Sequence, residues 1–290
     1  MLLRFNQTWA RSCVLLGLGA ALVLAPLHTA KADPTAYEVT NFAGVGQLSN
    51  LFGTVDLATG AFAQTSTLSF VPSGLGEVGS NLYTSTFTGT AFGQVNPATG
   101  AVTQISNTGL GGGEYLALGS ARNTLYGLDG SFNLYSIDPA TGAATLIGPT
   151  GLSPSPAYQL STGSSVLYFS SSNQLYTLNT LTGAATDIGP DLLSGAGFDG
   201  LVGENGVLYG GYSPTSIVPT SFYTIDVATG AATFLATQNA AVGVVYGLAP
   251  IVPEPSTWTH VRASSVDIRR LPPRLTQRFG EVLNPQRVPS

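Results

Sequence analysis

Apolar and polar residues alternate over short stretches of the chain, and one phrase recurs in which this alternation is clearest. At residues 134–148 it reads LYSIDPATGAATLIG, and related copies begin at Leu51, Ala91, Leu175 and Phe222. The Thr-Gly pairs at the centres of the copies follow one another at intervals of 40, 42, 41 and 47 residues. Alternation with a period of two predicts β-strands, and a strand-rich repeat of this length is typical of a β-propeller.

Each copy of the phrase predicts a β-hairpin. Asp138 can accept hydrogen bonds from backbone N–H groups two residues on, and Gly142 can adopt a positive φ that other residues resist. The chain then reverses and residues 143–147 pair back as a second strand. Only Asp or Asn occupies the Asp138 position in the other copies, so we interpret this position as a turn-forming one shared by all: Asp56, Asn96, Asn179 and Asp226.

A Leu-Tyr pair precedes the hairpin phrase in four copies, and a further tyrosine, Tyr246, lies near the end of the repeats. Because a tyrosine can bury its ring while its hydroxyl reaches an edge, we expect these rings to pack between stacked sheets. The tyrosines of the four pairs are Tyr83, Tyr126, Tyr168 and Tyr209.

Inner strands are predicted at residues 114–118, 157–160, 197–202 and 244–250. The last of these has no hairpin after it, and the first repeat has no convincing inner strand of its own. We therefore predict an all-β fold, a β-propeller of five four-stranded blades closed by the C-terminal strand 244–250. Closure of this kind removes exposed sheet edges.

The chain ends differ from the repeats and divide the chain into four regions. Residues 1–32 resemble a signal peptide, with Arg4 and Arg11 before a short apolar stretch and an A-x-A site ending at Ala32. We therefore expect export to the periplasm, the cell surface or the extracellular space. Cys13 is the only cysteine, so a chain that begins at Asp33 has no disulfide and no thiol.

The repeat region, residues 33–251, contains twelve acidic residues and a single basic one, Arg122, for a net charge of −11. Such a domain repels phosphate groups and anionic membrane surfaces. We therefore expect no nucleic acid partner, and no transmembrane segment in the mature chain.

The repeat region contains no His, Cys or Lys, since both histidines, His28 and His260, lie outside it. Serine-histidine and cysteine-histidine catalysis are thereby excluded, and we predict no enzyme, no catalytic residue and no cofactor. Carboxylate-only chemistry stays open as an alternative, a glycan hydrolase or lyase, in which two acids flank the bond that is cleaved. The acids placed closest to inner strands are Glu77 and Glu114.

Two further features suggest binding sites. Residues 211–220 form a longer loop than their counterparts, and insertions in repeat proteins often carry function, so Tyr212 is a candidate contact residue together with Glu77 and Glu114. Asp199 and Glu204 belong to an oxygen-rich stretch that could hold Ca²⁺, a cation that takes six to eight oxygen ligands.

After the repeats comes Val252-Pro253-Glu254-Pro255-Ser256-Thr257-Trp258, which resembles the VPEPSTW signature of the PEP-CTERM sorting domain of exported bacterial proteins. The resemblance implies processing by an exosortase, and surface export often accompanied by exopolysaccharide production. In that family a membrane-spanning helix follows the signature, whereas residues 259–290 here are polar and arginine-rich. We expect this last region to be a disordered basic tail.

Together these patterns predict an exported, non-enzymatic β-propeller at the cell surface or in the extracellular matrix that binds polysaccharide or a surface protein. The alternatives are the carboxylate-dependent hydrolase or lyase and a purely structural matrix protein.

Overall fold

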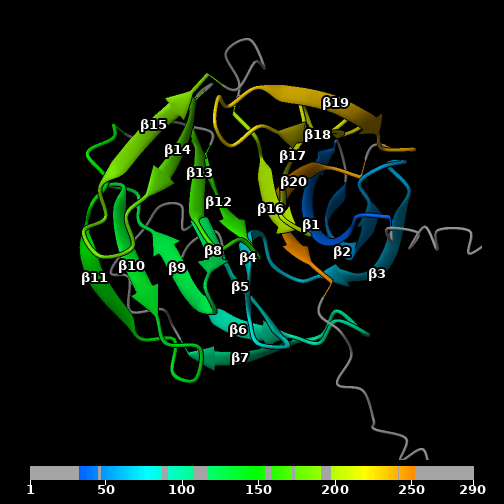
Figure 1. The fold of residues 1–290 in the computed structure, drawn as a ribbon. Helices are drawn as coiled ribbons and strands as arrows, with labels where there is room; N and C mark the ends of the chain where they lie inside the picture. Colours follow the sequence, from blue (N-terminus) through cyan, green and yellow to red (C-terminus); the bar gives the residue numbers. More distant parts are fainter. Residues whose placement is uncertain are drawn as a thin grey trace, which may run out of the picture. The chain divides into compact units, whose positions relative to one another are not determined.

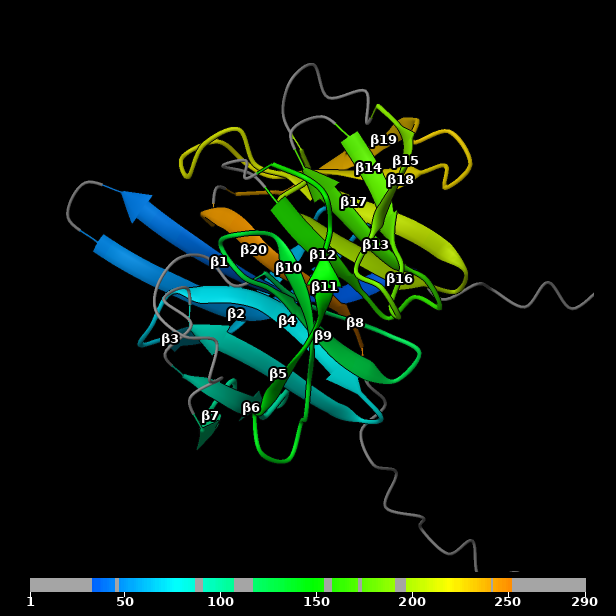
Figure 2. The same ribbon diagram turned by 90° about the vertical axis from the view of Figure 1, so that its left-hand side faces the viewer.

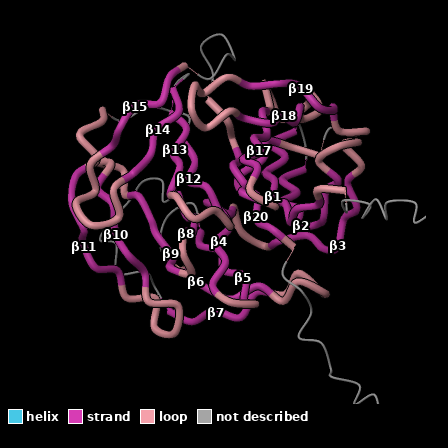
Figure 3. The backbone as a smooth tube through the Cα atoms, in the orientation of Figure 1, coloured by secondary structure: helices cyan, strands magenta, loops and turns pink. Residues whose placement is uncertain are grey.

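The computed structural model describes residues 33–44, 47–86, 91–106, 117–153, 158–171, 174–190, 197–240 and 242–251. These residues form strands joined by turns and loops (Figure 3). Within the described ranges there is no helix long and apolar enough to cross a membrane. All the strands belong to one compact unit that begins at Asp33.

The strands, in chain order, are β1 (Thr35–Gly44), β2 (Gln47–Asp56), β3 (Phe62–Leu68), β4 (Pro72–Val78), β5 (Asn81–Thr86), β6 (Phe92–Val95), β7 (Val102–Ser106), β8 (Ala117–Ala121), β9 (Thr124–Leu128), β10 (Asn133–Ile137), β11 (Ala144–Pro149), β12 (Tyr158–Thr162), β13 (Leu167–Ser171), β14 (Gln174–Leu178), β15 (Ala185–Gly189), β16 (Gly200–Glu204), β17 (Val207–Tyr212), β18 (Ser221–Ile225), β19 (Ala232–Thr237) and β20 (Val244–Pro250).

The strand order divides into five antiparallel groups of four. Group 1 is the sheet β20-β1-β2-β3, whereas β4–β7 (group 2) and β8–β11 (group 3) join into one sheet, as do β12–β15 (group 4) and β16–β19 (group 5). The joins are short parallel pairings, Gly74 with Leu118 and Ser161 with Leu201. The groups surround a common centre on which the first strand of each converges, so the fold is all-β and propeller-like (Figure 1).

Group 1 combines the two ends of the domain. Strand β20 pairs antiparallel with β1, and Ala36 lies opposite Pro250. The expectation that residues 244–250 supply the missing inner strand is therefore confirmed. Strands β1 and β2 have ten residues each, and their paired ends project beyond the neighbouring strands (Figure 2).

The apolar core is distributed between neighbouring groups. Five clusters of buried side chains each combine residues from two adjacent groups, and they include a cluster between groups 5 and 1 that contains Val55 and Phe222. Burial of apolar surface therefore holds every group to both of its neighbours, which accounts for a ring held together without disulfides.

The inner strands fill the centre of the ring. The Thr162 hydroxyl of β12 donates a hydrogen bond of 2.6 Å to the Leu75 carbonyl of β4, two groups away. A Cβ added at Gly247 of β20 would lie 2.6 Å from the Leu75 backbone nitrogen, so only glycine permits this approach. Sites with room for a ligand are consequently at the ends of the strands or between the groups.

The hairpin turns have the predicted chemistry. The Asp138 carboxylate accepts a hydrogen bond of 2.8 Å from the Ala140 backbone N–H, and Gly142 has a φ of 71°. The same backbone contact, at 2.8–3.0 Å, is made in the other copies by Asp56, Asn96, Asn179 and Asp226. The prediction of five structural turn residues is confirmed.

Each turn glycine also contacts the outer strand of the preceding group. Gly230 lies against Gly189, and a Cβ added to Gly230 would be only 2.8 Å from the Gly189 carbonyl oxygen. The other pairs are Gly100 with Ser66, Gly142 with Ser106, Gly183 with Gly148 and, from group 1 back to group 5, Gly60 with Thr237. The conspicuous Thr-Gly pairs thus serve both the turn and the contact between groups.

Burial confirms the core role of Tyr83, Tyr126 and Tyr209, and the partly buried Tyr168 and Tyr246 also pack against clusters between groups. Tyr246 lies on the inner strand β20, and the equivalent second strand of group 1 is β1 with Tyr37. Tyr37 stacks on Phe52 with ring centroids 5.6 Å apart, as Tyr83 stacks on Phe92 at the same distance.

Candidate binding sites

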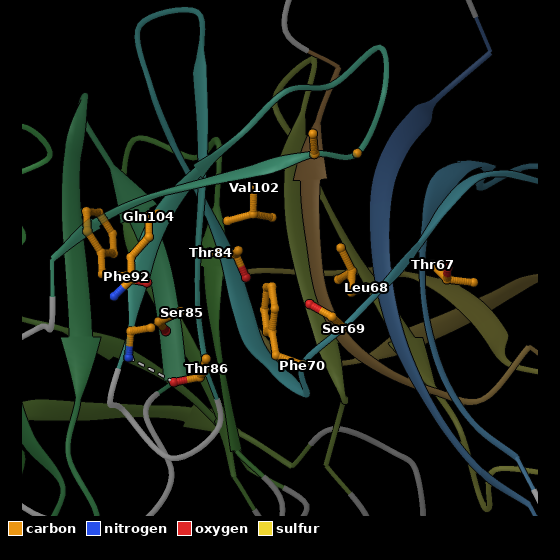
Figure 4. A pocket seen from close by; sticks show the side chains of 14 residues that line it. Thr67, Leu68, Ser69, Phe70, Thr84, Ser85, Thr86, Phe92, Val102 and Gln104 are labelled. Carbon is orange, nitrogen blue, oxygen red and sulfur yellow. Dashed lines mark hydrogen bonds between the residues drawn. The ribbon is translucent and has the colours of Figure 1, made fainter.

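A groove of about 370 Å³ lies between the outer strand of group 1 and group 2. Phe70, in the connection from β3 to β4, lies near the middle of this groove, with Ser69 and Thr84 beside it (Figure 4). Thr67, Ser85, Thr86 and Gln104 add to its polar lining, and no charged side chain is among the described residues that line it. The groove therefore offers hydroxyl, amide and aromatic groups.

The hydrogen bonds around the groove leave some of these groups available to a ligand. Thr84 donates to the Gly74 carbonyl at 2.9 Å and Thr86 accepts from the Ala91 N–H at 3.0 Å, so both are held in place. The hydroxyls of Thr67 and Ser69 are exposed and make no hydrogen bond to the described residues. Phe70 is half-buried against the cluster between groups 1 and 2, which fixes its ring at the groove.

A second cavity, of about 330 Å³, lies where the turns of groups 2, 3 and 4 meet. Glu77, near the end of β4, lines this cavity, and burial raises the pKa of its carboxyl group. Arg122, in the turn between β8 and β9, lines the same cavity. The structure thus places together a carboxyl group and the single basic side chain of residues 33–251.

Sequence reasoning did not identify Arg122 as a site residue. A signal was present, because Arg122 is the only basic residue in an otherwise acidic domain and precedes Asn123 between two predicted strands. Both residues have a positive φ, 48° and 61°, which is the geometry of a two-residue hairpin turn.

Tyr212 is the last residue of β17, immediately before the loop, and its half-buried ring packs against the cluster that contains Phe198 and Leu201. The exposed apolar side chains of this loop are instead Ile217, with 68% of its surface exposed, and Val218, with 40%. A contact surface at this loop would therefore be made by Ile217 and Val218 more than by Tyr212.

Asp199 is hydrogen-bonded to the start of the same loop. Its carboxylate accepts a hydrogen bond of 2.7 Å from the Ser213 N–H, and burial raises the pKa of Asp199 to about 7. Glu204 lies at the other end of β16, and an extended strand of this length separates the Cα atoms of the two residues by roughly 16 Å. The strand therefore separates Asp199 from Glu204, and the described residues contain no cluster of three metal-binding side chains.

Two sets of predicted residues lie outside the described ranges: Glu114, and the sorting motif at residues 252–258. The acid pair proposed for a glycan hydrolase, Glu77 and Glu114, is for that reason not placed as a pair. Glu77 is the only carboxylate among the residues that line its cavity.

No protein-family model and no curated protein sequence matches the chain. Among solved structures it is similar to a chain of a nidogen/laminin complex, with 14% identity over 74% of this chain and 97% of that chain and a TM-score of 0.48. It is also similar to a structural genomics protein of unknown function from Bacteroides thetaiotaomicron VPI-5482, with 18% identity over 75% of this chain and 65% of that one and a TM-score of 0.48. A glutaminyl cyclase from Myxococcus xanthus shares 17% identity over 59% and 71% of the two chains, with a TM-score of 0.44. Because these identities and TM-scores are low, we assign the propeller-like fold from the strand order. We take the function from the sites described above.

Proposed function

We propose that the chain is an exported, non-enzymatic, five-bladed β-propeller that binds a neutral glycan in the groove between β3 and group 2. The observation that carries the proposal is the lining of that groove, with an aromatic ring beside hydroxyl groups and no charge. Its volume of about 370 Å³ falls in the range of small-ligand sites.

A sugar ring has an apolar C–H face and a rim of hydroxyl groups. Phe70 matches the first, and the hydroxyls of Thr67 and Ser69 match the second because each can both donate and accept a hydrogen bond. A net charge of −11 on residues 33–251 disfavours acidic polysaccharides, so a neutral glycan fits best.

Five blades are supported by two independent patterns. Five apolar clusters lie between neighbouring groups, and five turn glycines contact the outer strand of the preceding group. In both patterns group 5 is followed by group 1, as a closed ring of five blades requires.

Export to the cell surface or matrix is supported by the sequence alone. Residues 1–32 resemble a signal peptide, and residues 252–258 resemble the PEP-CTERM signature, which makes an exosortase a partner of the chain. A glycan-binding site suits a protein sorted to a polysaccharide-containing surface.

Glycan binding can be tested by screening the full chain against an array of neutral and acidic polysaccharides, followed by calorimetry with the best neutral ligand. Phe70→Ala and Ser69→Ala should each weaken binding, about tenfold or more for Phe70, whereas Phe234→Ala, an exposed aromatic change on β19, should leave binding unchanged. Ser69 is exposed, so its substitution tests the groove even if Phe70→Ala lowers stability. Absence of neutral glycans among the ligands, or release of cleaved sugar from them, would overturn the proposal.

A further inference from the structure

The second cavity, lined by Glu77 and Arg122, has a chemistry that the glycan groove lacks. We propose that it binds a small α-amino acid, with the ligand's carboxylate on Arg122 and its ammonium group near Glu77. This site is separate from the glycan groove and goes beyond the proposed function.

Arg122 is positioned for a carboxylate ligand. Its Nε donates to the Ser165 carbonyl at 2.8 Å and its backbone N–H donates to the Ser164 carbonyl at 3.3 Å, so the guanidinium is fixed against group 4. Its two Nη groups make no hydrogen bond or ion pair to the described residues. A guanidinium fork held at one nitrogen presents its remaining donors in the geometry that suits a carboxylate.

Glu77 offers the complementary charge. Its side chain is half-buried, and its carboxyl group makes no hydrogen bond or ion pair to the described residues. Burial without a partner penalises the charged form of a carboxyl group, and a cation entering the cavity would remove that penalty. Because Glu77 and Arg122 do not pair with each other, each is left to a ligand.

The walls of the cavity are formed before any ligand arrives. The Ser120 hydroxyl of group 3 accepts from the Glu77 N–H of group 2 at 3.2 Å and from the Gly163 N–H of group 4 at 3.4 Å. The Asn123 side chain also accepts from the Gly79 N–H at 2.5 Å. These contacts fix the three turns relative to one another, so binding does not have to order them.

Charge selects the class of ligand. One carboxylate and one guanidinium give the cavity a balanced pair of charges, whereas the surrounding domain has a net charge of −11. An anionic ligand would be repelled by the domain, and a simple cation would leave Arg122 unpaired. A zwitterion has no net charge and satisfies both side chains, and a volume of about 330 Å³ accommodates an amino acid.

The test is ligand-observed NMR of the full chain with an equimolar mixture of the twenty protein L-amino acids, followed by calorimetry of the strongest binder. Its analogues that lack either the amino or the carboxylate group should bind at least tenfold more weakly. Glu77→Gln and Arg122→Asn should each weaken amino acid binding at least tenfold, and Asn is chosen because it tolerates the positive φ of this position.

Asp187→Asn, at an exposed position on β15, is the matched control and should not change binding. Thermal unfolding of each variant separates loss of binding from loss of fold. Absence of binding by all twenty amino acids, or binding unaffected by both cavity substitutions, would overturn the proposal. Glycan binding should persist in both variants, so the two sites can fail independently.

Discussion

The carboxyl group of Glu38 and the side-chain amide of Gln238 join the first group of strands to the last. Gln238 Nε2 donates to both carboxyl oxygens at 2.9 Å, and both side chains are buried, with 0% and 3% of their surfaces exposed. Burial raises the pKa of Glu38 to about 8, so Glu38 is protonated at neutral pH. Within the described residues Gln238 Oε1 is buried without a hydrogen-bond partner.

The Glu38–Gln238 pair makes the stability of the domain depend on pH. The pKa of Glu38 is higher in the folded than in the unfolded chain. Its contribution to the free energy of unfolding is therefore fully present below about pH 4.5 and is lost as the pH rises to about 8. Asp199, whose folded pKa is about 7, contributes with the same sign. We therefore expect the urea concentration at the midpoint of unfolding to decrease as the pH is raised from 5 to 8.5.

Glu38→Gln should remove much of this pH dependence while keeping the fold. A glutamine at position 38 has no titrating group, and its side-chain oxygen can still accept a hydrogen bond from Gln238 Nε2. The measurement is the urea midpoint at several pH values for the native chain, Glu38→Gln and Asp199→Asn. A native chain with a flat profile, or a Glu38→Gln variant as steep as the native chain, would contradict the protonated pair.

Gln238→Leu should be the more damaging change at this position. It leaves the Glu38 carboxyl buried without its donor, which costs about 1–3 kcal/mol of unfolding free energy. The matched comparison is Gln64→Leu at an exposed position on β3, which should have little effect. Equal losses for the two substitutions in denaturant unfolding would mean that the buried pair contributes nothing specific.

The turn glycines allow the cost of backbone conformation to be separated from the cost of lost contact. Gly206 has a φ of 79° and open space around it, so Gly206→Ala should cost about 1 kcal/mol. Gly142 has a φ of 71° and touches Ser106 and Phe92 of the preceding group, so Gly142→Ala should cost about 3 kcal/mol. Denaturant unfolding of both variants measures the difference, and equal losses would show that the contact between groups is unimportant.

Closure by β20 predicts opposite results for two truncations. A chain that ends at Ile251 should keep the unfolding midpoint of the full chain. A chain that ends at Gly243 should not fold, because β1 would lack its inner partner strand. Val245 and Leu248 would also be lost from the core. Circular dichroism and limited proteolysis distinguish the two outcomes. A folded chain without β20 would contradict the closure of the ring by this strand.

The hairpins and the closing strand could be predicted because the chemistry that forms them is local and repeated. Asp138 and Gly142 determine their own turn, and residues 244–250 stood out as a strand without a hairpin. The pairing of Glu38 with Gln238 could not be predicted, because the two residues are 200 positions apart and nothing in either neighbourhood marks the other.

The site predictions show the same division. Glu77 was identified from its place close to an inner strand, but its neighbour Arg122 belongs to the next group and is brought to the cavity only by the packing of turns. The groove that contains Phe70 was missed because Phe70 lies in an irregular connection between repeats, where no pattern marks it. Asp199 and Glu204 are close in sequence but lie at opposite ends of an extended strand.

The pairing of β20 with β1 brings Ala36 opposite Pro250, so the chain enters and leaves the domain side by side. A tether attached before Asp33 or after Ile251 would therefore hold the domain at nearly the same place, beside the paired ends of β1 and β20. Either attachment would present the same surfaces outward, so the orientation of the bound domain would not depend on which end is retained. The same proximity makes the domain a candidate for circular permutation, with a short linker across the two ends and new termini at the turn of residues 205–206.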